Sequence, residues 1–135
     1  MVTALERERY GIHSEMEWFD FESVLRDRVV KVRFTFLEFD SGLTIPVNLD
    51  DELEDVKFMI VINENDDYEL QLLSLVHEIE HIFHNYLSLP QSIRSRDSSE
   101  YRGYEDSIDS EASKFLEKHK DLVARVHGTL YMWSL

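Results

Sequence analysis

A compact apolar run at residues 57–63 (KFMIVIN), followed by a long segment with helical spacing, constrains the fold more than any other feature of the chain. The run is rich in β-branched residues and lies between an acidic stretch and a turn-like polar stretch, so it predicts a central strand. From Tyr68 to about Leu87 the apolar residues recur every three to four positions, which predicts a helix that Pro90 closes. The chain must therefore pack a sheet against at least one long helix.

Three segments nearer the N-terminus also have clear periods. The spacing Ser14-Glu15-Met16-Glu17 is typical of a capping box, and the apolar residues after it predict a helix over about 14–27. The alternation from Val30 to Phe36 predicts a strand with one buried face. The segment Leu43–Val47 predicts a short strand that pairs back on the sheet. Its Pro46 lacks an N–H group and therefore favours an edge position.

The C-terminal part predicts one further helix. Residues 91–103 are polar and are expected to form an exposed loop that contacts substrate, and helical spacing then runs from about Glu105 towards Gly128. The apolar tail at 130–133 is expected to pack back on the body. Together these elements predict a single α+β domain over residues 1–135, in which a small antiparallel or mixed sheet packs with three main helices.

Composition excludes several classes of protein. The chain has 28 acidic and 14 basic residues, a formal charge of −14, and no cysteine. Without cysteine there is no disulfide framework, no zinc ribbon and no thiol nucleophile. A surface this acidic repels phosphate backbones and anionic lipids, so we expect no direct binding to nucleic acid or membrane, and a basic partner would be attracted. The sequence shows no apolar stretch of the length that a signal peptide or a membrane span needs, which favours a cytoplasmic protein.

The chemistry is expected in the predicted helix over 68–87, at His77-Glu78-Ile79-Glu80-His81. On a helix, His77 and His81 project from one face about 6 Å apart, so one tetrahedral Zn²⁺ can take both imidazoles. Glu78 is rotated about 100° from His77 and can reach a water molecule on that metal as a general base. These are the parts of metal-assisted hydrolysis.

The alternative interpretation is a pair of surface histidines on a charged helix. Against it, Leu70 and Leu73 lie on the side of the two histidines, while Leu72 and Val76 lie on another. A helix that is apolar on two sides is buried, and buried histidines need partners.

A third protein ligand is expected, because a catalytic zinc usually has three. Glu111 is the first candidate, since it lies on the apolar face of the last predicted helix, although a marginal surface position is the alternative. Glu105 and Asp109 are fallbacks on other faces of the same turns. His84 shares the face of His77 but is about 10 Å away along the axis, so it is expected to support or pack beside the ligands rather than to bind the metal.

From about Phe58 to Phe115 the chain resembles the ImmA/IrrE zinc metallopeptidases. The matching stretches are Ile60-Val61-Ile62-Asn63, Leu73-Ser74, His77-Glu78-Ile79-Glu80-His81, His84 and Glu111-Ala112-Ser113-Lys114-Phe115. The resemblance implies that His77, His81 and Glu111 hold zinc and that Glu78 is the general base. It also implies an endopeptidase that cleaves a DNA-binding repressor, such as a basic helix-turn-helix protein in phage, mobile-element or stress regulation.

The chain departs from that family at Glu80, where the family has glycine. A second hypothesis therefore stays open, in which the protein is a non-catalytic, metal-stabilised binding module such as an antirepressor or a toxin-like partner. In the enzymatic hypothesis, the strand at 57–63 is expected to border the cleft and to pair with an extended substrate segment.

Overall fold

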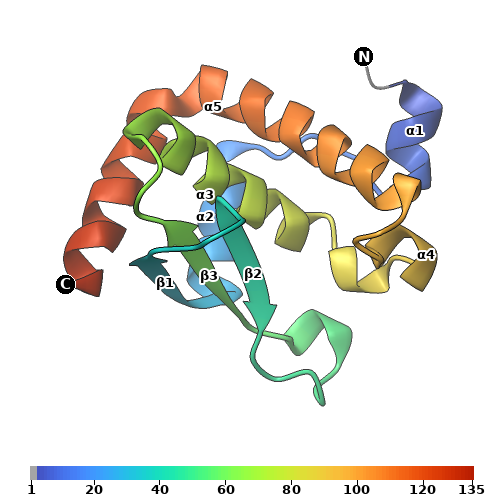
Figure 1. Ribbon diagram of the computed structural model, residues 1–135, viewed down its shortest axis with the longest axis horizontal. Helices are drawn as coiled ribbons and strands as arrows, with labels where there is room; N and C mark the ends of the chain where they lie inside the picture. The colour runs from blue at the N-terminus through green and yellow to red at the C-terminus, as the bar shows by residue number, and fades with distance from the viewer. Residues whose placement is uncertain (1–2) are drawn as a thin grey trace.

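Strand β3 (Phe58–Asn63) forms the centre of a three-stranded sheet in the computed structural model, which describes residues 3–135. It pairs in parallel with β1 (Val29–Thr35) and antiparallel with β2 (Gly42–Pro46), so the strand order is β1-β3-β2 (Figure 1). The prediction of a small mixed sheet with a central strand at 57–63 is confirmed. Pro46 lies in an edge strand, as its missing N–H favours.

One face of the sheet supplies the main hydrophobic core. The alternating residues Phe58, Ile60 and Ile62 of β3 are almost fully buried there, together with Val32 and Phe34 of β1. Since successive side chains of a strand point to opposite faces, this alternation fixes which face of the sheet the helices cover. The layer of helices above that face carries the chemistry described below.

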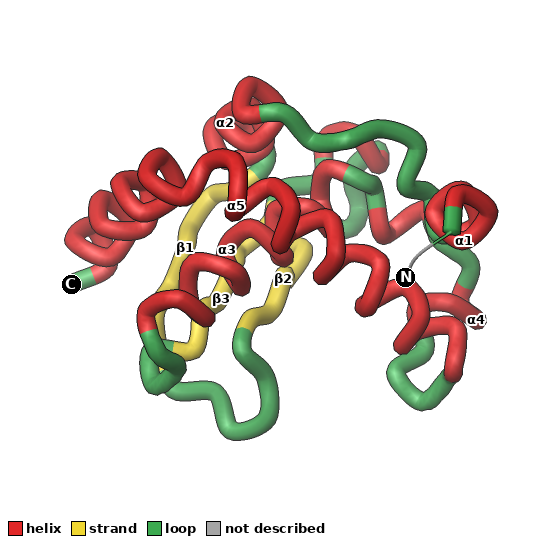
Figure 2. Tube along the Cα trace, turned by 90° about the horizontal axis from the view of Figure 1, so that it is seen from above, coloured by secondary structure: helices red, strands yellow, loops and turns green. Residues whose placement is uncertain are grey.

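Three main helices cover the sheet, as predicted. They are α2 (Trp18–Asp27), α3 (Tyr68–Phe83) and α5 (Ser99–Ser134). Helix α3 contacts β2 and β3 and lies along α5, while α2 and the later part of α5 contact β1 (Figure 2). The remaining helical segments are short: α1 (Ala4–Arg9), α4 (Gln91–Arg94) and the 3₁₀ turns Leu53–Asp55 and Tyr86–Ser88.

Several predicted boundaries differ from the structure. Helix α2 begins at Trp18 rather than at residue 14, because the Glu17 N–H donates to the Asp20 carboxylate (2.9 Å) and the cap therefore lies three residues later. The predicted exposed loop at 91–103 contains α4 and the first turn of α5, whose N-terminus is capped by the Ser98 hydroxyl accepting from the Tyr101 N–H (2.9 Å).

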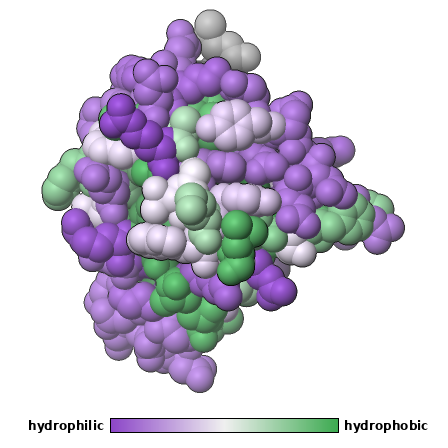
Figure 3. Space-filling view, turned by 90° about the vertical axis from the view of Figure 1, so that its left-hand side faces the viewer, coloured by the Kyte–Doolittle hydropathy of each residue, from purple (hydrophilic) through white to green (hydrophobic). Residues whose placement is uncertain are grey.

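The prediction that the tail at 130–133 packs back on the body is correct only in part. Helix α5 bends at His119, which has non-helical dihedral angles, and continues to Ser134. Leu130 packs against the main core, but Met132 and Trp133 are 71 % and 79 % exposed. Figure 3 views the side of the molecule that holds this end of the chain, where hydrophobic side chains lie among hydrophilic ones. Among residues 3–135, no helix combines the length and the apolar character that crossing a bilayer requires.

Candidate metal centre

Helix α3 brings His77, Glu78 and His81 together, as the spacing predicts. The helix starts where the Asp67 carboxylate accepts from the Leu70 N–H (2.8 Å), and its other face is fixed in the main core by residues such as Leu72 and Ile79. Each of the three motif residues offers one ligand atom, and these atoms lie within 4.8 Å of one another. A zinc ion binds each ligand atom at about 2 Å from the ion, so small side-chain movements would let these three residues hold one.

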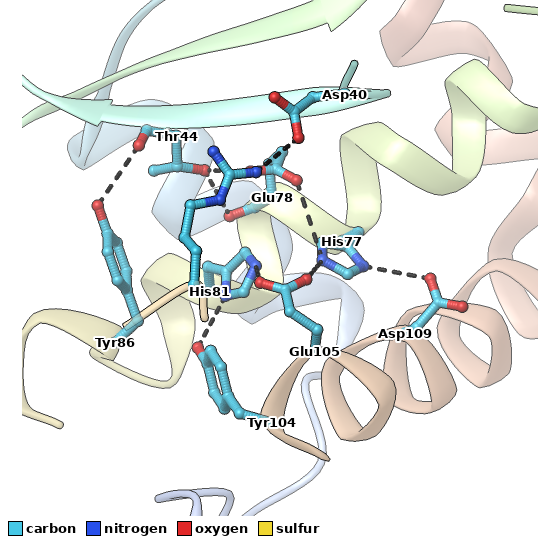
Figure 4. A network of polar contacts seen from close by, with 10 residues as sticks. Asp40, Thr44, His77, Glu78, His81, Tyr86, Tyr104, Glu105 and Asp109 are labelled. Carbon is cyan, nitrogen blue, oxygen red and sulfur yellow. Dashed lines mark hydrogen bonds and ion pairs between the residues drawn. The ribbon is translucent and has the colours of Figure 1, made fainter. Parts of the chain in front are cut away.

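A carboxylate from α5 meets both histidines. Glu105 Oε2 lies 2.7 Å from His77 Nε2, and Glu105 Oε1 lies 3.1 Å from His81 Nε2 (Figure 4). Asp109, one turn further along α5, lies 3.2 Å from His77 Nδ1. Two imidazole nitrogens and a carboxylate oxygen that face one another are a donor set that zinc prefers. The residues present therefore fit a divalent metal held by His77, His81 and Glu105.

The structure does not bring Glu111 to the histidines. Its buried carboxylate accepts from Arg7 of α1 (2.7 Å) and pairs with Lys114 (3.3 Å). Six residues along a helix turn the side chain by about 600°, so Glu111 points about 120° away from Glu105. The structure therefore does not support the expectation that Glu111 is the third ligand, and it places the fallback candidate Glu105 beside the two histidines instead.

His84 and Glu80 form a separate buried pair. His84 Nε2 lies 3.2 Å from Glu80 Oε1, and both side chains are almost fully buried. Burial raises the pKa of Glu80, an effect that the partner His84 opposes. Neither residue lines the cavity at the motif, so the Glu80 side chain adds no bulk to the candidate site.

The acidic neighbours Glu105 and Asp109 raise the pKa of His77. Burial alone would lower the pKa of His77, but hydrogen bonds to Asp109 and Glu105 and the charge of Glu78 raise it to about 10. Burial would in turn raise the pKa of Glu105, but the hydrogen bonds from His77 and His81 hold it well below its usual range. Without metal, His77 is therefore a cation at neutral pH that donates from both ring nitrogens.

We expect zinc binding to release the proton of His77, because only a neutral imidazole can donate a lone pair to a metal. Since the pKa of His77 is raised to about 10, the apparent affinity for zinc should rise about tenfold per unit between pH 7 and pH 9. Titration calorimetry in buffers with different heats of ionisation measures the released proton directly. Equal affinity at pH 7 and pH 9 would contradict the protonated state.

The motif lies in a cavity of about 510 Å³ between α3, β2 and α5. Gly42, Leu43 and Thr44 of β2 line it, and so do Gln91, Arg94, Arg96 and Tyr101 of the segment predicted to contact substrate. The expectation that the strand at 57–63 pairs with substrate is wrong, because β3 lies between β1 and β2 and both of its edges are used. Strand β2 borders the cavity instead and, within the described residues, pairs on one side only.

Two features of β2 position Glu78. The Thr44 hydroxyl donates to Glu78 Oε1 (2.8 Å), and Gly42 leaves room for the carboxylate, since a Cβ there would lie 3.1 Å from Glu78 Cγ. Across the same cavity Arg96 pairs with Asp40 (2.7 Å) and links the segment after α4 to the loop before β2.

Sequence reasoning missed two groups that contact the motif. Thr44 is far from the motif in the chain, so only the pairing of β2 with β3 brings it there. The other group is Tyr104, whose hydroxyl lies 2.7 Å from His81 Nδ1. Tyr104 directly precedes Glu105, and Asp109 follows Glu105 one turn later on α5, which begins at Ser99. An earlier helix start would have put Tyr104 and Glu105 inside the predicted helix.

The three comparisons with known proteins give no further guide to the family. The chain matches no protein-family model, no curated protein and no solved structure.

Proposed function

We propose that the protein is a zinc-dependent endopeptidase. The observation that carries this proposal is the meeting of His77 and His81 with Glu105, beside a carboxylate, Glu78, that makes no ion pair with lysine or arginine among the described residues. Open cavities that hold such a donor set and a nearby carboxylate are typical of metal-assisted hydrolysis.

The roles of the residues follow from their positions. His77, His81 and Glu105 would hold the metal, which when bound would polarise a substrate carbonyl and lower the pKa of a water molecule. Glu78, held by the Thr44 hydroxyl at 2.8 Å, would take a proton from the attacking water and deliver it to the leaving amine. Asp109 would hold the His77 ring in place through Nδ1.

The ligand we propose for this cavity is an extended peptide. Adding a strand to the outer edge of β2 would supply hydrogen bonds that do not depend on sequence, and would carry the peptide past Glu78. The substrate would then be an exposed, extended segment of a protein.

The substrate we propose is a basic helix-turn-helix repressor in the cytoplasm, in phage, mobile-element or stress regulation. The resemblance to the ImmA/IrrE peptidases supports this class, and the charge of −14 supports a basic partner. An acidic surface accelerates encounter with such a partner and keeps the enzyme away from DNA.

The test uses purified full-length protein, stripped of metal by a chelator and reloaded with Zn²⁺. The protein is incubated with a proteome-derived peptide library and with candidate repressors, and new termini are identified by mass spectrometry. We expect cleavage that needs zinc and stops on chelation. Tight zinc binding without any new termini would favour the second hypothesis, a metal-stabilised binding module.

Gly42→Ala is expected to lower kcat/KM about tenfold and to leave zinc affinity within about twofold. The added Cβ would lie 3.1 Å from Glu78 Cγ and 3.2 Å from Oε2, so the carboxylate must shift by a few tenths of an ångström, and proton transfer depends on such distances. The control is Gly128→Ala, because a Cβ there meets no atom within 4 Å. Unchanged cleavage in Gly42→Ala would show that Glu78 is not held where we place it.

A further inference from the structure

His81 makes a hydrogen bond on the side that faces away from the candidate ligands. Its Nδ1 lies 2.7 Å from the Tyr104 hydroxyl, whereas its Nε2 faces Glu105 at 3.1 Å (Figure 4). Both residues are buried, with exposed fractions of 7 % for His81 and 2 % for Tyr104. If the hydroxyl oxygen accepts the Nδ1 proton, the lone pair of His81 is left on Nε2, where a metal would need it.

Tyr104 is itself held by the N-terminal part of the chain. The ring of Tyr10 packs edge-on against the ring of Tyr104, with centroids 6.1 Å apart. The end of the Tyr10 side chain occupies the space over Gly103, so that a Cβ at position 103 would overlap the Tyr10 hydroxyl and lie 3.1 Å from its Cζ. The absence of a side chain at Gly103 is therefore what lets Tyr10 reach Tyr104.

The segment that carries Tyr10 is fixed at several points on α5. Arg7 donates to the buried Glu111 (2.7 Å), and Arg9 pairs with Glu100 (2.7 Å). Tyr10 and Ile12 also belong to a small hydrophobic cluster, separate from the main core, that is completed by Leu89, Ile93, Tyr104 and Ile108. This cluster ties residues 3–12 to the part of α5 from which Tyr104 and Glu105 project.

We propose that Tyr104 is a positioning residue for His81, and that the N-terminal segment sets the position of Tyr104 through the contact of Tyr10 with Gly103. Metal affinity is then coupled to residues 3–12, which line no part of the cavity at the motif. This inference rests on the proposed metal site, but it does not need the protein to cleave a peptide.

Zinc affinity of the full-length protein, measured by competition with a chromophoric chelator, tests the direct contact first. Tyr104→Phe keeps the ring and removes only the oxygen that faces His81 Nδ1. We expect it to weaken zinc binding about tenfold, the usual effect of losing such a partner. In the zinc-loaded protein, the Nδ1 proton of His81 should be protected from exchange, and it should exchange faster in the variant. A variant with only weakened packing would not change this proton signal.

The coupling to the N-terminal segment is tested at Gly103. Gly103→Ala removes no atom that touches His81, yet it should weaken zinc binding about as much as Tyr104→Phe, because its Cβ displaces Tyr10. The double variant should be no weaker than Tyr104→Phe alone, since both changes act through one hydrogen bond. Tyr10→Phe combined with Gly103→Ala should recover part of the affinity, because the overlapping hydroxyl is gone. Gly128→Ala, on the same helix with open space around it, is the matched control and should bind zinc as the wild type does.

The outcomes separate this inference from the proposed function. Wild-type zinc affinity in Tyr104→Phe would overturn the positioning role, and wild-type affinity in a folded Gly103→Ala variant would overturn the coupling to Tyr10. If the expected losses occur in a protein that cleaves no peptide, the inference stands and the peptidase proposal fails. Failure of the wild type to bind zinc would overturn both.

Discussion

Glu105→Gln is expected to weaken zinc binding by at least about 100-fold, whereas Glu111→Gln leaves it within about twofold. The carboxylate of Glu105 faces both His77 Nε2 and His81 Nε2, and an amide is a much poorer ligand for zinc than a carboxylate. The carboxylate of Glu111 is held by Arg7 and Lys114 instead. The amide oxygen of the Glu111→Gln variant can still accept from Arg7, so the N-terminal segment that packs on Tyr104 stays in place. Because the two changes are chemically identical and lie on one helix, their difference reports the position of each side chain alone.

The stability of the metal-free Glu111→Gln variant tests the structural role of Glu111 separately. Glu111→Gln removes the charge of a buried partner of Arg7, which should lower the free energy of unfolding by about 1–2 kcal/mol. Competition with a chelator measures the zinc affinities, and thermal or urea unfolding of the metal-free proteins measures the stabilities. Loss of zinc in Glu111→Gln with full affinity in Glu105→Gln would restore Glu111 as the ligand.

Glu78→Gln is expected to lower peptide cleavage about 1000-fold while zinc binds within about threefold of wild type. The amide keeps the shape of the side chain and still accepts from the Thr44 hydroxyl, but it has no basic oxygen to take a proton from water. The measurement is kcat/KM on a peptide identified by mass spectrometry, beside zinc affinity for the same preparation.

The matched control for Glu78→Gln is Glu69→Gln. Glu69 lies in the first turn of the same helix, is exposed, and pairs with Lys120 (2.8 Å). Its replacement should change neither cleavage nor zinc affinity. Cleavage by Glu78→Gln at the wild-type rate would remove the general base from the proposal. A parallel loss of zinc would make Glu78 a ligand, a role that its place within 4.8 Å of the histidine nitrogens allows.

The sequence predicts best those elements whose apolar residues recur at a regular spacing because one side of the element packs in the core. The central strand and α3 present continuous patterns to the buried side, so their type and order follow from Phe58, Ile60, Ile62 and Leu72. The short helices α1 and α4 have four to six residues and mostly exposed or half-buried side chains, so they carry no period. The parallel pairing of β1 with β3 also has no local signal, because only the tertiary arrangement sets it.

The sequence predicts the part of the candidate site that lies on α3. His77, Glu78 and His81 are fixed relative to one another by the turn of α3 alone. Choosing between Glu105 and Glu111 needs the rotation of α5 about its own axis, which depends on where Ser98 caps the helix and on a partner, Arg7, that is 104 residues away from Glu111. The resemblance to the ImmA/IrrE family implied Glu111, whose carboxylate the structure places with Arg7 and Lys114 instead.

Because the main core and the small hydrophobic cluster are separate, a metal bound between them would tie the two together. His77 and His81 belong to a helix anchored in the main core, while Glu105 follows Tyr104, a member of the small cluster. A metal shared by these residues would act as a cross-link that closes the loop between His81 and Glu105, including α4. Loading the ion would then restrain the small cluster much as a disulfide restrains a loop, in a chain that has no cysteine to make one.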